Sequence, residues 1–300
     1  MRKGVFAVIA ASFLYGIMPM LMKQVIITGL PDGRAVFYRM FFAAIAAFVR
    51  VILTGNRFKI EAGQILALAF FGTLGYGMTS ALTAASYRYI PTGLATMFQF
   101  TYPLFVTVVM TLVFREKLNP LKIISCLRAL GGLGLLADFS ALSPLGIGLA
   151  TFSGVTYGLY IIASRKSPFR PLPGIVIVFY ACFFSAVFCG ARAGITGSLK
   201  VLPGPKALVL LLIIAVFCSV ASRFLLNMGI RDLGASTASV LNMLEPVVSV
   251  VAGALIYKEV MGLKGLIGCA LVIISGLAVA LSGSGEEEKV KVHVNTKRVG

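Results

Sequence analysis

The sequence contains no tryptophan and only one histidine, His293, which lies in the polar C-terminal end. A single histidine at this place argues against a histidine-based metal site and against a Ser-His-Asp triad. The five cysteines all lie in apolar stretches without the spacing of metal ligands, so we interpret them as small core residues. Glycine-rich stretches lack the GxxxxGKS/T pattern, which argues against ATP hydrolysis by this chain. We therefore expect no cofactor and no metal.

Charged residues are also scarce, at 12% of the chain, whereas hydrophobic residues make up 59% and the mean hydropathy is +0.97. A soluble domain carries about 25% charged residues. The excess of apolar surface predicts an all-α integral membrane protein. The net charge of +17 is explained by basic cytoplasmic loops and anionic lipid, with an anionic substrate as the alternative. The basic residues are spread along the loops, so we do not expect nucleic-acid binding.

Ten apolar runs are long enough to cross a bilayer, which needs about 20 residues per helix. The polar segment 283–300 is expected to be a flexible cytoplasmic tail, and the first run is too long for a signal peptide. Lysine and arginine are more frequent in the loops on the N-terminal side, which predicts cytoplasmic termini in a plasma (inner) membrane. The predicted spans are 4–28, 33–53, 62–86, 92–114, 120–137, 144–166, 173–193, 206–230, 236–257 and 262–282.

The two halves of the chain resemble each other. Pro246 follows Pro103 by 143 positions, and the same shift relates Glu259 to Glu116. This predicts two five-helix repeats, over 1–140 and 141–282. Because five is odd, the repeats must have opposite orientations, as in secondary transporters that bind substrate near the membrane midplane.

Glu245 is the one acidic residue in the middle of an apolar run, and Pro246 follows it. Asn242 and Ser249 share its helical face. A carboxylate and a proline are both costly in a lipid-buried helix, so their pairing suggests a site. Glu245 could bind a proton or a substrate amine. The alternative is a structural carboxylate that stabilises the broken helix.

Arg223 lies with Ser219 and Asn227 on one polar stripe of an apolar span. Its guanidinium could bind a carboxylate or phosphate. The alternatives are a side chain that extends to cytoplasmic water or an ion pair with Glu245.

Other basic residues in the spans have less specific explanations. Lys23 and Arg39 lie toward the outer ends of their spans, where extension of the side chain to water is expected. Arg128 lies close to mid-depth, and a contact between copies, a bond to backbone carbonyls and a substrate role all stay open.

Several polar aromatic residues could line a cavity. Tyr15 and Tyr157 are each followed by glycine in the first span of each half, and Tyr76, Tyr102 and Gln99 complete the set from the first half. These rings could stack on a substrate. Core packing or anchoring at the membrane interface is the alternative.

Two further features are interpreted as structural. Glu116 and Glu259 precede the last span of each half, where a carboxylate can cap the helix N-terminus. Gly154 and Gly158 form a GxxxG pair, which indicates close helix packing.

Several short motifs are distributed over both halves of the chain. They are Leu244-Glu245-Pro246-Val247-Val248, Tyr257-Lys258-Glu259, Gly265 to Gly268, Ile274-Ser275-Gly276, Tyr102-Pro103-Leu104, Phe114-Arg115-Glu116 and Phe37-Tyr38-Arg39. Together they resemble the drug/metabolite transporter superfamily and, within it, the ten-helix EamA-type transporters, and the resemblance covers essentially residues 4–282. The family pair Trp-Gly in the first helix is replaced by Tyr15-Gly16, which removes stacking on an indole.

The resemblance implies an inverted-repeat fold and export or exchange of small metabolites, often amino acids. Our leading hypothesis is a secondary transporter that moves amino acids or related organic acids by alternating access. Glu245 would be the coupling or amine-binding group, and Arg223 would bind the carboxylate. Gln99, Tyr102, Asn242 and Tyr76 would form the cavity wall. A sugar-phosphate or nucleotide-sugar exchanger and an uncoupled facilitator are the alternatives. An intramembrane enzyme is disfavoured because no mid-depth histidine, cysteine pair or carboxylate pair is present. Protons and membrane lipid are the other expected partners, and the oligomeric state stays open.

Overall fold

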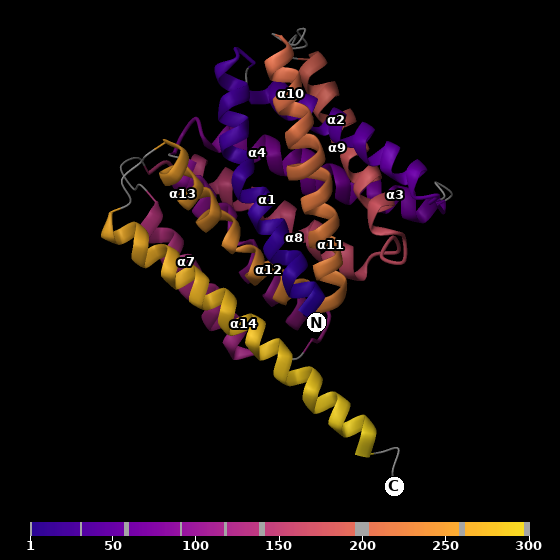
Figure 1. Cartoon of the computed structure of the whole chain (residues 1–300), viewed down its shortest axis with the longest axis vertical. Coiled ribbons are helices and arrows are strands. Elements are labelled where there is room, and N and C mark those ends of the chain that lie inside the picture. The colour runs from indigo at the N-terminus through magenta and orange to yellow at the C-terminus, as the bar shows by residue number, and fades with distance from the viewer. Residues whose placement is uncertain are drawn as a thin grey trace.

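The structure is a computed structural model, and it describes the segments 2–30, 32–56, 60–90, 92–116, 119–137, 142–195, 204–257 and 262–296. These segments fold into helices joined by short connections, with no strand among them. Figure 1 shows the helices gathered in one bundle, with the C-terminal part of the last helix projecting beyond it. The start of the first helix and the end of the last lie toward the same end of the molecule (Figure 1).

Each half contributes five helical segments, some of them divided into shorter helices. The first half consists of α1 (Arg2–Ile27), α2 (Asp32–Leu53), α3 (Ala62–Gly72), η1 (Thr73–Met78), α4 (Thr79–Ser86), α5 (Thr92–Gln99), α6 (Tyr102–Leu112) and α7 (Pro120–Leu136). The second half consists of α8 (Pro144–Lys166), α9 (Gly174–Ile195), α10 (Pro205–Ile213), η2 (Ile214–Ala221), α11 (Ser222–Leu233), α12 (Ala235–Asn242), α13 (Leu244–Tyr257) and α14 (Leu263–Thr296).

The predicted all-α membrane fold is confirmed. Within the described segments, 9 helices are long and apolar enough to cross a bilayer. The remaining predicted span, 120–137, corresponds to α7, which has 17 residues and packs along α14. Ten membrane helices therefore account for the bundle. The backbone of α14 continues as a helix to Thr296, beyond the predicted end of the last span at 282, and the predicted flexibility of 283–300 stays a prediction.

Helical irregularities recur at equivalent places in the two halves. The third span of each half contains a π-helical stretch, η1 or η2, and the fourth span is broken, between α5 and α6 and between α12 and α13. Pro103 and Pro246 explain the breaks, because a proline cannot donate to the carbonyl four residues earlier. Those carbonyls belong to Gln99 and Asn242. The two repeats thus share a broken helix as well as a sequence pattern.

The first helix of each half packs against the broken span of the other half. α1 contacts α11, α12 and α13, whereas α8 contacts α4, α5 and α6. Two glycines permit this approach. A Cβ atom on Gly16 would lie 2.7 Å from the carbonyl oxygen of Glu245, and one on Gly154 would overlap the carbonyl oxygen of Gln99. The predicted close packing at Gly154 is therefore present, and the centre of the bundle is built from both halves.

The cysteines lie where the sequence predicted. All five are buried and free of disulfides, and in the described part of the chain no group of His, Cys, Asp and Glu is arranged to hold a metal ion. Four of them, Cys126, Cys182, Cys218 and Cys269, belong to the apolar core clusters of the bundle.

Candidate functional site

A polar cavity lies at the centre of the bundle, where the irregular parts of the helices meet. Its volume is about 100 Å³. It takes residues from α1, α2, η1, α4, α5 and α6 in the first half and from α8, η2, α11 and α13 in the second. The lining residues are Tyr15, Met18, Arg39, Gly75, Tyr76, Thr79, Ser80, Gln99, Phe100, Tyr102, Tyr157, Cys218, Ser219, Arg223 and Glu245.

Glu245 lies in the first turn of α13 and is held by Asn242, the last residue of α12. The Asn242 side-chain amide donates to Glu245 Oε2 at 3.2 Å and to the Tyr102 hydroxyl at 3.0 Å. Its Oδ1 atom accepts from the Ser12 hydroxyl at 3.1 Å. Asn242 is fully buried behind the cavity wall, so the structure brings it to the site as a support for Glu245 and Tyr102.

Arg223 is buried in α11, with 1% of its surface exposed. Its guanidinium lies over the ring of Tyr76 and, at 4.5 Å from the centroid, over that of Tyr160. Nε and Nη1 have no hydrogen-bond partner among the described residues. Neither the ion pair with Glu245 nor an extension to cytoplasmic water is formed. A buried guanidinium with unused donors is costly by itself, and it fits a ligand that carries negative charge.

The interpretation of Arg39 as a side chain that extends to water is wrong. Arg39 is 8% exposed and lines the cavity. Its Nη2 atom donates to the Ser80 hydroxyl at 3.3 Å, Nη1 lies 2.8 Å from Met18 Sδ, and Nε has no partner in the described segments. Position along the helix gave the depth of Arg39 but not the direction of its side chain. The match of Phe37-Tyr38-Arg39 to the family pattern was the signal that pointed to it.

Tyrosines form much of the remaining wall. The hydroxyls of Tyr15 and Tyr76 lie 3.0 Å apart, which joins α1 to η1. The rings of Tyr102 and Tyr157 meet edge to face, with centroids 4.9 Å apart. Together with Gln99, these four tyrosines line the cavity as the sequence predicted. Their part in binding a substrate stays a prediction.

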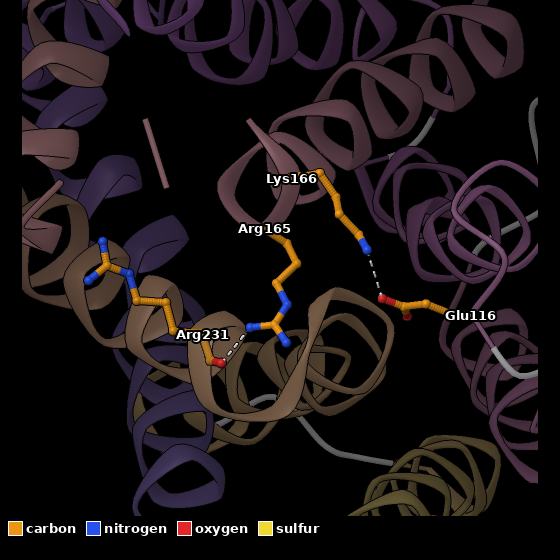
Figure 2. A network of polar contacts seen from close by, with 4 residues as sticks. All are labelled: Glu116, Arg165, Lys166 and Arg231. Carbon is orange, nitrogen blue, oxygen red and sulfur yellow. Dashed lines mark hydrogen bonds and ion pairs between the residues drawn. The ribbon is translucent and has the colours of Figure 1, made fainter. Parts of the chain in front are cut away.

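A second polar network lies at the C-terminal ends of α8 and α11, and Figure 2 shows it from close by. Glu116 forms an ion pair with Lys166 at 3.4 Å, and Lys166 also lies 5.0 Å from the Phe114 ring centroid. Arg165 Nη1 donates to the backbone carbonyl of Arg231 at 2.7 Å. These contacts connect the end of α8 to the segment after α6 and to the end of α11, so they join the two halves.

This network corrects the expected role of Glu116. Asn119, and not Glu116, is the N-cap of α7, because its side chain accepts from the backbone N–H of Leu121. Glu116 is structural through its ion pair. The corresponding Glu259 lies outside the described residues. Arg128 is exposed on α7 and does not line the cavity.

A family assignment follows from the sequence of both repeats. A sequence model of the EamA-like transporter family matches residues 2–137 and 144–281, which is most of the chain. The protein belongs to the EamA-like transporter family. It is therefore a multi-pass membrane transporter, which implies a small-molecule substrate and a lipid environment.

The chain is also similar to two known proteins. An uncharacterized transporter of Archaeoglobus fulgidus is 25% identical over 241 residues, covering 78% of this chain and 83% of that protein. A solved crystal structure matches with a TM-score of 0.81 and 16% identity, over 94% of this chain and 98% of the other. At this identity the second likeness shows the fold alone.

Proposed function

We propose that this EamA-family protein is a secondary transporter that exports or exchanges small amino acids or related organic acids. The observation that carries this proposal is that one cavity holds both a carboxylate, Glu245, and a guanidinium, Arg223. An amino acid presents the opposite pair of charges. Its ammonium group complements Glu245, and its carboxylate complements the unused Nε and Nη1 donors of Arg223.

The second guanidinium, that of Arg39, extends this pattern. Arg39 shares the cavity with Glu245 and keeps an unused Nε donor. With Glu245 ionised, two cations face one anion, which favours substrates with at least one acidic group. Proton binding to Glu245 would change this balance. We infer that a proton gradient can drive transport through the charge of this residue.

Alternating access is supported by the size of the cavity and by its walls. The cavity of about 100 Å³ is smaller than the roughly 300 to 1,000 Å³ of ordinary ligand sites. A substrate therefore needs a wider state. The broken fourth spans and the π-helical third spans supply backbone that can rearrange without melting a regular helix. We place these elements in two inverted repeats whose relative movement opens the site to one side at a time.

The basic end of the bundle suggests the orientation. Arg50, Arg165, Lys166, Arg170 and Arg231 lie at the ends of helices or in loops on the side of the N-terminus. Positive residues are retained on the cytoplasmic side of bilayers. This supports an orientation with both termini in the cytoplasm.

Exchange in proteoliposomes tests the proposed function. Purified protein is reconstituted, the vesicles are loaded with single unlabelled amino acids, organic acids or sugar phosphates, and uptake of the labelled compound is measured with and without a pH gradient. We expect exchange of small amino acids or organic acids, and no exchange in vesicles without protein. Exchange of sugar phosphates alone would overturn the proposal.

A sugar-phosphate or nucleotide-sugar exchanger is the second candidate, and one specific observation favours it. Two buried guanidiniums, Arg39 and Arg223, face one cavity, and arginine pairs bind phosphate well. The carboxylate of Glu245 weighs against it, because it repels a phosphate dianion. Equal transport with and without a pH gradient, for a neutral or zwitterionic substrate, would instead identify an uncoupled facilitator.

A further inference from the structure

A second hollow, larger than the central cavity, opens on the side of the bundle between α2 and the continuous η2–α11 segment. Its volume is about 920 Å³. Pro173 and the first two residues of α9, Gly174 and Ile175, contribute to its lining. The residues that line it are all different from those of the central cavity. It joins a first-half helix to second-half helices, so we call it the inter-repeat groove.

The walls of the inter-repeat groove are two apolar stripes. On α2 the stripe contains Phe42, Ile45, Ala46, Val49 and Leu53 at helical spacing. The second stripe follows η2 and α11 at intervals of four residues, and it begins one turn earlier on α10. Its residues are Leu212, Val216, Val220, Phe224 and Met228. Ile45, Val49 and Val216 are between 41% and 47% exposed. The groove thus offers a long apolar surface that faces the membrane.

Polar groups are confined to one end of this groove. Arg50 lies in the last turn of α2 and Arg231 in the last turn of α11, and both line the groove there, with Thr54 and Asn56 beside them. Among the described residues, the lining contains no acidic side chain. From Phe42 to Leu53 the α2 stripe advances by eleven residue steps, or about 16 Å at 1.5 Å per step. The groove therefore runs from mid-depth to a positively charged end.

The guanidinium of Arg231 is held in place at this end. Its Nη2 atom donates to the backbone carbonyls of Arg170, at 2.9 Å, and Leu172. A guanidinium has further N–H groups that can reach an anion. Figure 2 shows the Arg231 side chain pointing away from the Glu116–Lys166 pair, whose carboxylate is already paired with a lysine. The neighbouring acidic residue, Asp232, lies against Gly4 of α1 and not in the groove.

We propose that the inter-repeat groove binds a membrane phospholipid with an acidic head group. One acyl chain lies along the apolar stripes, and the phosphate contacts Arg50 and Arg231. The groove opens to the bilayer, which makes a lipid the available ligand, and the charge at its end selects an anionic head group. Basic sites between membrane helices on the cytoplasmic side suit such head groups. This site does not depend on the transported substrate or on the cavity around Glu245.

Native mass spectrometry of the full-length protein in detergent tests the head-group part of the proposal. The protein is titrated with phosphatidylglycerol and, separately, with phosphatidylcholine of the same acyl chains. We expect phosphatidylglycerol to bind about tenfold more tightly, because phosphatidylcholine adds a choline cation beside Arg50 and Arg231, which repel it, whereas phosphatidylglycerol carries only the negative phosphate. Arg50→Gln should remove most of this preference. Lys122→Gln, the same charge loss on α7 outside the groove, should leave it unchanged.

A pair of bulky substitutions tests whether the lipid acyl chain lies in the inter-repeat groove. Val49→Trp fills the groove, whereas Ile52→Trp adds the same bulk on an α2 residue that is 55% exposed and does not line it. We expect only Val49→Trp to weaken binding of both lipids, with the thermal midpoint of the lipid-free protein compared first. Equal binding of the two lipids, no effect of Arg50→Gln, or no effect of Val49→Trp would overturn the proposal. So would a change of oligomeric state in Val49→Trp, which would make the groove an interface between copies.

Discussion

The side chain of Asn242 donates a hydrogen bond to the hydroxyl of Tyr102, which lies 140 positions earlier in the chain, at 3.0 Å. This bond joins the broken span of one repeat to the broken span of the other. The same amide supports Glu245. Because the bond links the two repeats, their relative movement in the proposed mechanism must either preserve this bond or break it.

The Asn242–Tyr102 bond should contribute measurably to stability. Asn242→Ala leaves the buried Tyr102 hydroxyl without its partner, and we expect a loss of about 1 to 3 kcal/mol. A double-mutant cycle with Tyr102→Phe, followed by thermal unfolding in detergent, should give an interaction energy of about 1 kcal/mol. Tyr157→Phe is the control, since the described contacts of Tyr157 with the pair are through its ring. Additive effects of Asn242→Ala and Tyr102→Phe would show that the bond does not stabilise the fold.

Glu245→Gln should separate exchange from coupling. The substitution keeps the shape and a hydrogen-bonding group beside Asn242 but removes the carboxyl group that can gain and lose a proton. We expect substrate exchange to continue in proteoliposomes while accumulation driven by a pH gradient disappears. Glu116→Gln is the control, because it makes the same change in a partly exposed ion pair with Lys166. Exposed ion pairs contribute about 0 to 1 kcal/mol to stability, so this variant should transport like the original protein. Retained pH-driven accumulation in Glu245→Gln would remove this residue from the coupling mechanism.

Arg223→Lys should weaken binding of acidic substrates. Lysine keeps the charge but loses the planar fork that lies over the Tyr76 and Tyr160 rings. For a carboxylate substrate we expect the half-saturation concentration to rise by about tenfold, or about 1.4 kcal/mol. The corresponding primary amide, which has no carboxylate, should be affected little. Arg88→Lys changes an exposed arginine in the same way and serves as the control. Equal losses for the acid and the amide would indicate that Arg223 acts only through the fold.

Much of this fold could be predicted because hydrophobic length and repeat spacing are properties of the sequence itself. The places of Glu245 and Arg223 on one cavity were predictable for the same reason, since a charge in an apolar span must have a special environment. The position of Asn242 behind the cavity wall was harder to predict from the sequence. Asn242 precedes Glu245 by three residues, so a continuous helix would present both side chains on one face. The helix breaks at Met243, and the two side chains therefore do not both face the cavity.

The errors arise where tertiary packing decides the direction of a side chain. Arg39 was assigned to water because it is near a helix end, yet Ser80 of α4 and Met18 of α1 surround it. Glu116 was assigned to a helix cap because it precedes a helix, yet Asn119 is nearer and Lys166 of the other repeat is within reach. Such contacts join segments far apart in the chain, and neither spacing nor composition encodes them.

The last prediction concerns the glycine at which α8 meets the break in the fourth span. A Cβ atom on Gly154 would overlap the Gln99 carbonyl oxygen and lie 3.2 Å from its carbon, and this backbone cannot rotate away. Gly154→Ala should therefore cost about 1 to 3 kcal/mol, as overpacking does, and lower transport by displacing Gln99. Gly148→Ala changes the same helix at a place with no atom within 4 Å, so stability should stay equal or rise slightly. Thermal unfolding and exchange assays of the two variants compare them directly. If both behave alike, close approach of α8 to the helix break is not what requires glycine at position 154.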